Sequence, residues 1–257
     1  MHNFYSDTQT RPTRAMRQAV LEAETGDEQM GEDPTTNALC ARVAELLGKA
    51  AAVFLPSGTM CNEIAIAVHC RPGDEVICAR NAHVIVAEGG GPAALSGVMM
   101  HPLDDARGIL HPSSVRNALR AGGRYAPRSR LVCVEQTVNL EGGVVWPLEA
   151  LRAVAAVASE AGLASHIDGA RLMNAVVASG VPAAEMAQGY DSVWIDFTKG
   201  LGAPIGAVLA GSEAFIAEAW RFKQRWGGAL RQSGIAAAMC LYALDHHVER
   251  LAGDHAL

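Results

Sequence analysis

The sequence predicts an α/β domain with a mainly parallel, seven-stranded sheet wrapped by helices. Short apolar runs bounded by turn residues alternate with longer Ala-rich amphipathic stretches, which is typical of a sheet covered by helices. The chain has 257 residues, of which 50% are hydrophobic, so it can bury a large core. Because most strands are joined through helices, we expect parallel pairing and a ligand site beyond the carboxyl ends of the strands.

The expected elements follow from this alternation. Strands are expected at residues 51–56, 74–79, 98–103, 130–136, 164–168, 192–197 and 206–211. Helices are expected at residues 13–24, 34–47, 59–70, 83–95, 112–121, 147–161, 171–179 and 212–225. Residues 241–257 resemble one long amphipathic helix without a Gly or Pro terminator near its end. No repeat or Pro/Ser-rich linker marks a boundary, so one domain over residues 1–257 is expected.

Charge and composition exclude several classes of function. The net charge is -6 and no basic block is present, so a small molecule is a better partner than a nucleic acid. No apolar run reaches the roughly 18 to 20 residues of a membrane span, and no secretory signal opens the chain, so a cytoplasmic protein is expected. The six cysteines form no C-x-x-C pair and are expected to be reduced core residues. His246 and His247 are adjacent rather than one helical turn apart, so no metal site is expected.

Lys199 is the most informative candidate. In FTKGLGAPIGAVLAG, residues 197–211, this lysine follows a buried strand and precedes a Gly-rich turn. Burial disfavours the ammonium form and frees the amine for attack on an aldehyde, as Schiff-base chemistry requires. The glycines would let a flat ring approach the backbone closely. The segment by itself fits an ordinary surface lysine at a strand end equally well.

Asp168 and Arg171 lie at the end of another expected strand, in HIDGARLMNA, residues 166–175. A carboxylate at this position can keep a pyridine nitrogen protonated, which makes the ring an electron sink. The planar fork of Arg171 suits a carboxylate. The alternative is a buried Asp168 to Arg171 ion pair that only caps a helix.

An anion site is expected where a strand turns into a helix in LPSGTMCNEIA, residues 55–65. Ser57, Gly58 and Thr59 would open the helix, and the free amides of a helix N-terminus suit a phosphate, although S-G-T also occurs as a plain N-cap. His83 follows the next strand, where an imidazole could stack on a flat ring or move protons. A single histidine is more often structural.

In combination these segments have the layout of fold-type I enzymes that use pyridoxal 5'-phosphate. More narrowly, the chain resembles the threonine aldolase family of β-eliminating lyases over its whole length. The resemblance rests on SDTQTRPT (6–13), GDEQMGEDPT (26–35), LPSGTMCN (55–62), RPGDEVIC (71–78), HIDGARLMNA and TKGLGAPIGAVLAG. It implies the large domain of the aspartate aminotransferase fold, with an N-terminal arm at residues 1–35. Family members continue into a smaller C-terminal domain, so this domain is expected to be absent or truncated here.

The resemblance also implies an activity and roles for individual residues. The reaction would be the retro-aldol cleavage of L-threonine, L-allo-threonine or a related β-hydroxy amino acid to glycine and an aldehyde. The implied roles are Lys199 as the Schiff-base lysine, Asp168 opposite the ring nitrogen, His83 stacked on the ring, Ser57, Gly58 and Thr59 with Arg231 of a neighbouring subunit on the phosphate, and Ser6 with Arg171 on the substrate carboxylate. Arg231 implies at least a dimer, and the family suggests a tetramer.

Departures from the family pattern leave three questions open. Val138 stands where a histidine is usual, so the base for the β-hydroxyl could be His83, Glu88 or a phosphate-held water. Gln224 replaces a common lysine and Lys223 is adjacent, so charge at the phosphate is expected to be rearranged. Asp196 has no assigned role, and a strand-end carboxylate that is satisfied by nearby donors is expected there.

The alternatives are β-elimination or transamination on the same scaffold, and a non-catalytic remnant. The segment GGGPAA, residues 89–94, is not a dinucleotide fingerprint, so an NAD site is not expected.

Overall fold

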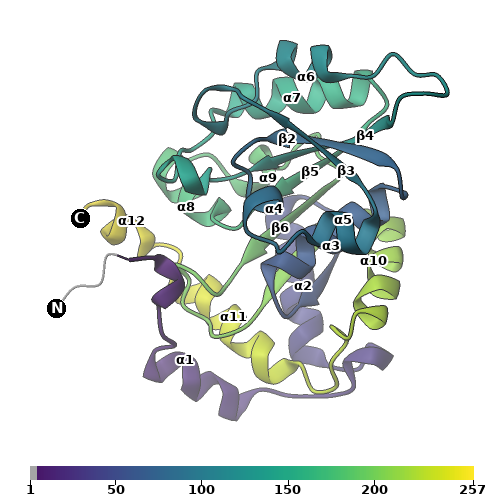
Figure 1. The fold of residues 1–257 in the computed structure, drawn as a ribbon. Coiled ribbons are helices and arrows are strands. Elements are labelled where there is room, and N and C mark those ends of the chain that lie inside the picture. The colour runs from purple at the N-terminus through teal and green to yellow at the C-terminus, as the bar shows by residue number, and fades with distance from the viewer. Residues whose placement is uncertain (1–4) are drawn as a thin grey trace.

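A single mixed sheet forms the centre of the molecule in a computed structural model that describes residues 5–257 (Figure 1). Within these residues the sheet has seven strands in the order β1-β7-β6-β5-β4-β2-β3. The strands are β1 Ala51–Leu55, β2 Asp74–Ala79, β3 Met99–Leu103, β4 Arg128–Glu135, β5 Ala164–Asp168, β6 Ser192–Asp196 and β7 Ala207–Gly211. Only β7 runs against its neighbours, β1 and β6. The predicted fold class is therefore confirmed, and each predicted strand lies within two residues of an observed one.

Helices pack on both faces of this sheet. Those of the described residues are α1 Arg14–Ala19, α2 Pro34–Leu47, α3 Gly58–His69, α4 His83–Val86, α5 Gly91–Ser96, α6 Pro112–Ala118, α7 Leu148–Glu160, α8 Leu172–Ser179, α9 Ala183–Met186, α10 Glu213–Arg225, α11 Gly234–His246 and α12 Leu251–His255. None of these helices combines the length and apolar character needed to cross a bilayer. The bounds of α2 match the prediction because Asp33 caps its start, Pro34 occupies its first position and Gly48 ends it with a left-handed φ of 62°.

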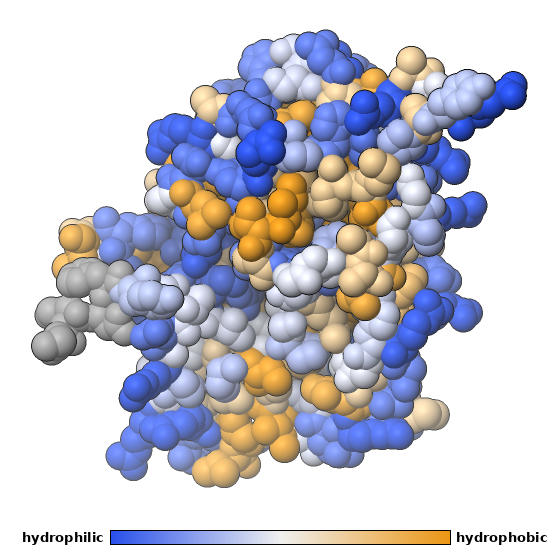
Figure 2. All heavy atoms as spheres, in the orientation of Figure 1, coloured by the Kyte–Doolittle hydropathy of each residue, from blue (hydrophilic) through white to orange (hydrophobic). Residues whose placement is uncertain are grey.

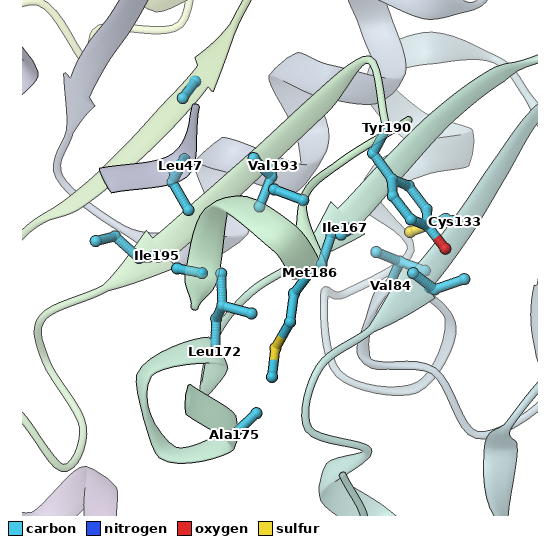
Figure 3. Packing of buried hydrophobic residues seen from close by; sticks show 14 of the residues in the cluster. Leu47, Val84, Cys133, Ile167, Leu172, Ala175, Met186, Tyr190, Val193 and Ile195 are labelled. Carbon is cyan, nitrogen blue, oxygen red and sulfur yellow. The ribbon is translucent and has the colours of Figure 1, made fainter. Parts of the chain in front are cut away.

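Alternate residues of β1, β7 and β6 point into two separate cores. Phe54 of β1 belongs to the larger core, whereas its neighbours Val53 and Leu55 belong to a smaller one beneath α3 and α10. Figure 3 shows part of the larger core, where Leu172 and Met186 pack against Ile167 and Val193 of the sheet. The sheet is buried on both faces, which explains why its strands are almost continuously apolar.

Three predicted helices end earlier than expected. The segment 83–95 divides into α4 and α5 because Gly89 and Gly90 adopt positive φ values of 62° and 75°. The segment 13–24 gives α1 followed by a 3-10 turn at Val20–Glu22. The C-terminal segment is also interrupted, because α11 ends at His246 and the ring of His247 hydrogen-bonds the Leu201 carbonyl at 2.7 Å. The short helix α9 was not predicted, since four residues are too few to show a helical period.

Asp33 joins three distant segments of the chain. It is fully buried, and one of its oxygens accepts from the amide of Thr36 at 2.8 Å. The other accepts from the amides of Gly26 at 3.1 Å and Gly234 at 3.0 Å. Asp33 therefore fixes the N-terminal arm and the start of α2 to the start of α11. Burial raises the pKa of this carboxyl, but the hydrogen bonds outweigh burial and the net pKa lies below its ordinary value.

A second buried contact fixes the same arm. Lys223 of α10 is completely buried, pairs with Glu28 and lies 4.2 Å from the ring centroid of Trp220. The other Glu28 oxygen accepts from the Leu230 amide at 2.8 Å. The motif GDEQMGEDPT thus holds the arm in place through Glu28 and Asp33.

Replacing Asp33 by Asn tests this connection. The amide group of an asparagine would face the N–H donors of Gly26 or Thr36, so the free energy of unfolding should fall by about 2 to 4 kcal/mol in urea titrations at pH 7. Because the folded-state pKa of Asp33 is lowered, its contribution is complete above the unfolded value of 3.8 and is lost as the pH falls below that value. Asp245→Asn, which removes only a half-exposed ion pair with Arg42, should cost less than about 1 kcal/mol. Equal losses in the two variants would contradict this role of Asp33.

Candidate functional site

A cavity of about 290 Å³ lies at the carboxyl ends of β1, β4, β5 and β6. It contains eight of the nine predicted site residues. The lining residues are Ser6, Thr8, Ser57, Gly58, Thr59, His83, Glu135, Asn139, Asp168, Ala170, Arg171, Trp194, Asp196, Thr198 and Lys199. A larger hollow of about 630 Å³ lies at the opposite edge of the sheet and contains none of the predicted residues. The smaller cavity is therefore the candidate active site.

Lys199 faces this cavity with a partner that the sequence did not suggest. Its ammonium group donates to Asp196, whose side chain is almost fully buried. The other Asp196 oxygen accepts from the amide and hydroxyl groups of Thr198 at 3.0 Å and 2.9 Å. Asp196 is thereby held in one orientation and fixes the amine of Lys199. The only available signal was a carboxylate three residues before the lysine.

The chain has three lysines, and the other two have structural partners. Lys49 donates to the carbonyl oxygens of Ala187 and Tyr190 at 2.9 Å and 2.5 Å. Lys223 is buried against Glu28, away from the cavity. Within the described chain Lys223 therefore adds no charge at the cavity, and the expected rearrangement of charge at the phosphate stays a prediction. Lys199 is the one lysine of the three that lines the cavity.

Ser57, Gly58 and Thr59 form the start of α3, as predicted. The Ser57 hydroxyl caps the helix by accepting from the Met60 amide at 3.3 Å. Amides in the first turn of a helix have no partner within the helix, so they are free to bind an anion. At Gly58 a Cβ atom would lie 2.2 Å from the Trp194 ring, so only glycine allows this close approach. The helix N-terminus is therefore packed tightly against the cavity wall.

Asp168 is buried and is held by Asn62, a residue that the sequence analysis did not single out. The Asn62 amide nitrogen donates to Asp168 at 2.8 Å and to Glu88 at 2.7 Å. The other Asp168 oxygen accepts from the Ala170 amide at 3.0 Å. Burial and the charge of Glu88 raise the pKa of Asp168 above its ordinary value. Within the described residues no ion pair includes Asp168, so a cationic ring nitrogen would complete its environment.

A hydrogen-bonded chain continues from Asn62 through the protein. The Asn62 oxygen accepts from His166 Nε2 at 3.1 Å, so His166 Nδ1 accepts in turn from the Ser192 hydroxyl at 2.8 Å. Ser192 then accepts from His69 Nε2 at 2.8 Å, beside the larger hollow. Burial lowers the pKa of His166 to about 3 and that of His69 to about 4, so both rings are neutral. The Asn62 oxygen therefore fixes the tautomers of both histidines, because the Asn62 nitrogen is already the donor to Asp168 and Glu88.

His83 is oriented from behind by Glu88. Its Nδ1 lies 2.8 Å from Glu88, whose side chain is fully buried and does not line the cavity. The hydrogen bond to Glu88 is the main cause of a raised His83 pKa. Of the candidate bases, Glu88 therefore lies behind His83 and does not face the cavity. Val138 is buried outside the cavity, as its apolar side chain suggests.

Glu135 is a cavity residue that the sequence analysis missed. It ends β4 directly opposite Asp168, and it accepts from the amides of Asn139 at 3.2 Å and His83 at 3.3 Å. Burial, together with the charge of Asp168, raises the pKa of Glu135 to about 7. A carboxyl group with such a pKa can exchange a proton near neutral pH. Its position at a strand end was the signal available in the sequence.

Arg171 and Ser6 meet at the cavity, but Arg171 does not pair with Asp168. Instead, its Nε and Nη2 donate to the two oxygens of Asp7 at 2.8 Å and 2.7 Å. The predicted alternative of an Asp168 to Arg171 cap is therefore wrong, because Asp7 occupies the planar fork. Ser6 accepts from the Thr8 amide at 3.2 Å, which places its hydroxyl beside this ion pair.

Arg231 is the predicted residue that the described chain does not bring to the cavity. Its side chain is 62% exposed, and its guanidinium group pairs with Asp27 at 2.8 Å. Within one chain it therefore has a surface partner in the arm. The expected contact with a phosphate requires a second copy of the chain.

Comparisons with known proteins agree with this geometry. A family model described as beta-eliminating lyase matches residues 3–257. The chain is 43% identical over 256 residues to the low specificity L-threonine aldolase of Escherichia coli (strain K12), covering 99% of this chain and 76% of that protein. It is 41% identical over 256 residues to low-specificity L-threonine aldolase 1 of Arabidopsis thaliana, covering 97% and 71%. The solved structure of Leishmania major threonine aldolase has the same fold, with a TM-score of 0.85 at 22% identity, covering 98% of this chain and 75% of that one.

Replacing Asn62 by Asp tests its role at the centre of the site. The variant places a third carboxyl group beside Asp168 and Glu88 and removes both donor hydrogens. The free energy of unfolding should fall by about 3 kcal/mol at pH 8 and by less at pH 5.5, because protonation of the new carboxyl relieves the repulsion. Urea titrations at the two pH values measure this, and the exposed Asn117→Asp serves as the control. A loss independent of pH would show that charge is not the constraint.

Proposed function

We propose, from the premise that this chain belongs to the beta-eliminating lyase family, that it is a pyridoxal-phosphate-dependent aldolase. It cleaves L-threonine, L-allo-threonine or a related β-hydroxy amino acid to glycine and an aldehyde. One observation carries the proposal: the amine of Lys199, the carboxylate of Asp168 and the N-terminus of α3 surround one cavity. The relatives named as L-threonine aldolases support the same reaction class.

The residues present fit pyridoxal phosphate. The free amides at Gly58 and Thr59 suit its phosphate, and the absence of a Cβ at Gly58 keeps the cavity wall closed against Trp194. Asp168 is a buried carboxylate without a cationic partner in the described chain, so it suits the protonated ring nitrogen. Lys199 provides the amine for the aldehyde. When bound, the cofactor supplies an electron sink for a bond to Cα.

The residues around Lys199 and Asp168 then have distinct tasks. Asp196 holds the amine of Lys199 toward the cavity when that amine is free. Asn62 holds the Asp168 carboxylate through one hydrogen bond and so fixes its direction. His83 supplies a flat ring at the cavity wall for stacking.

Arg171 and Ser6 bind the carboxylate of the substrate. Asp7 engages two of the three nitrogens of the Arg171 guanidinium group, which leaves Nη1 for the substrate. Such fixed binding turns the amino acid so that its Cα to Cβ bond can stand perpendicular to the cofactor ring. Asp7 therefore contributes by holding the arginine in a single orientation.

The proton of the β-hydroxyl group needs an acceptor at the cavity. His83 and Glu135 line the cavity, whereas Glu88 and Val138 do not. Both lining residues are held by hydrogen bonds, and the pKa of Glu135 near 7 allows it to accept a proton at neutral pH. A water held by the phosphate is the remaining alternative.

The functional unit is a homo-oligomer, a dimer or a tetramer, in which Arg231 of one copy reaches the phosphate of another. Arg231 is exposed in the single chain. Apolar side chains gather at the surface over α4 and also near α1 and α11 (Figure 2). Val86 at 51% and Leu21 at 77% exposure are among the exposed apolar residues. Surfaces of this kind suit contact with a second copy.

Borohydride trapping tests the assignment of Lys199. Reduction of the protein with bound pyridoxal phosphate should abolish its visible absorption and add the cofactor mass to one tryptic peptide, the one that contains Lys199. Lys199→Ala should lose the band and lower the rate of threonine cleavage by about a thousandfold or more. Lys49→Arg is the control, since Lys49 bonds only to backbone carbonyl groups. Label on Lys49 or Lys223 would overturn the assignment.

Product analysis separates the candidate reactions. With L-threonine, the proposed reaction gives glycine and acetaldehyde in equal amounts. Accumulation of 2-oxobutanoate would instead identify β-elimination, and no product with bound cofactor would identify a non-catalytic protein.

A further inference from the structure

Two buried carboxyl groups lie against each other behind His83. Glu63 of α3 is 3% exposed, and neither of its carboxylate oxygens has a hydrogen-bond partner in the described part of the chain when both groups are ionised. The Glu88 oxygen that does not contact His83 is unsatisfied in the same way. Neither residue lines the cavity, so a substrate cannot satisfy these three oxygens. Unpaired buried carboxylate oxygens are costly, so this arrangement requires an explanation.

In the described part of the chain, neither the hydrogen bonds nor the ion pairs give Glu63 a cationic partner. Its charged neighbour is Glu88, which contacts His83 and is linked to Asp168 through Asn62. On the other side, α5 carries no titratable residue, and a Cβ atom at Gly91 would lie 2.0 Å from a Glu63 oxygen. The ion pairs of the described residues do not include Glu63. Two adjacent full negative charges would therefore be uncompensated here.

A bound cation does not resolve this. The ligand-type atoms of His83, Glu88 and Asp168 lie within 4.8 Å of one another. However, the amide hydrogens of Asn62 point at both carboxylates and occupy the space between them. A metal ion there would face the positive end of that amide.

We propose that Glu63 and Glu88 share one proton and that Glu63 is a positioning residue, which fixes Glu88 against His83. The Glu63 hydroxyl donates to the free oxygen of Glu88, and the pair carries one negative charge. The other Glu88 oxygen then accepts from His83 Nδ1 and from Asn62. His83 thereby presents Nε2 to the cavity. The inference rests on the proposed function only for the role of His83 at the cavity.

The pair has a defined response to pH. Burial, the charge of Glu88 and the hydrogen bond between the two carboxyl groups raise the pKa of Glu63 to about 8. Below this value the shared proton is present. Above it the pair carries a second negative charge. This charge repels Asp168 and Glu135 and raises the affinity of His83 for a proton.

Infrared spectroscopy tests the shared proton without relying on activity. The protein carrying pyridoxal phosphate is compared at about pH 6 and about pH 10 with Glu63→Gln, which keeps a donor but cannot ionise. The wild type should show a C=O band of a protonated acid at the lower pH that Glu63→Gln lacks. Glu149→Gln, a change at an exposed glutamate of α7, should keep the band. Identical wild-type and Glu63→Gln spectra would overturn the proposal.

Two further measurements separate positioning from a purely structural role. The His83 ring signals in a nitrogen-15 NMR titration should show a second inflection near pH 8 in the wild type and in Glu149→Gln, but not in Glu63→Gln. Glu63→Val should lower kcat by about tenfold, because Glu88 loses its donor. Glu63→Gln should recover most of that loss, and its kcat should fall less steeply at alkaline pH than that of the wild type. If kcat of the wild type and of Glu63→Gln fell equally at alkaline pH, Glu63 would not be a positioning residue. If threonine is not cleaved at all, the proposed function fails, while the infrared and NMR results still decide the shared proton.

Discussion

The candidate site depends on burying several carboxylates at one edge of a parallel sheet with few cations among them. Asp168, Glu88 and Glu135 lie close together there, and the uncharged Asn62 binds two of them with the hydrogens of one amide nitrogen. An amide can supply two donors without adding a charge, so it lowers the repulsion while leaving the site negative. That residual charge is what a cationic ring nitrogen opposite Asp168 would neutralise. The orientation of Asn62 in turn determines the tautomers of His166 and His69, so one polar network spans the protein.

The N-terminal arm contributes contacts to the site itself. Asp7 fixes Arg171, and Thr10 donates to the Lys199 carbonyl at 2.7 Å. The arm is also attached further along by Glu28 and Asp33, whose partners come from α10, α11 and the segment between them. The motifs SDTQTRPT and GDEQMGEDPT therefore have different tasks, the first at the cavity and the second in the attachment. Lys223 takes part in the attachment through Glu28 and does not line the cavity.

The observed differences from expectation have local physical causes. Residues 83–95 kept a helical pattern in sequence, but Gly89 and Gly90 take positive φ values, and the break lets Glu88 turn inward beneath His83. Arg171 was expected to bind either Asp168 or a substrate, yet Asp7, 164 positions away, occupies two of its nitrogens. Asn62 and Glu135 carried no signal beyond their places near the sheet edge, because one polar residue on an apolar face has no periodicity that reveals its partners.

The sequence by itself determined the sheet, the order of its strands along the chain and the residues at the strand ends, because apolar alternation and turn residues act over short distances. It also determined that Lys199, Asp168 and the start of α3 would meet, since the carboxyl ends of parallel strands share one edge. Only the tertiary structure decided which buried groups face each other: Asn62 between Asp168 and Glu88, Asp196 on Lys199, and Glu63 behind Glu88. Such contacts join residues far apart in the chain. Their energies depend on burial and on the distances between charges, which a local pattern of residues does not predict.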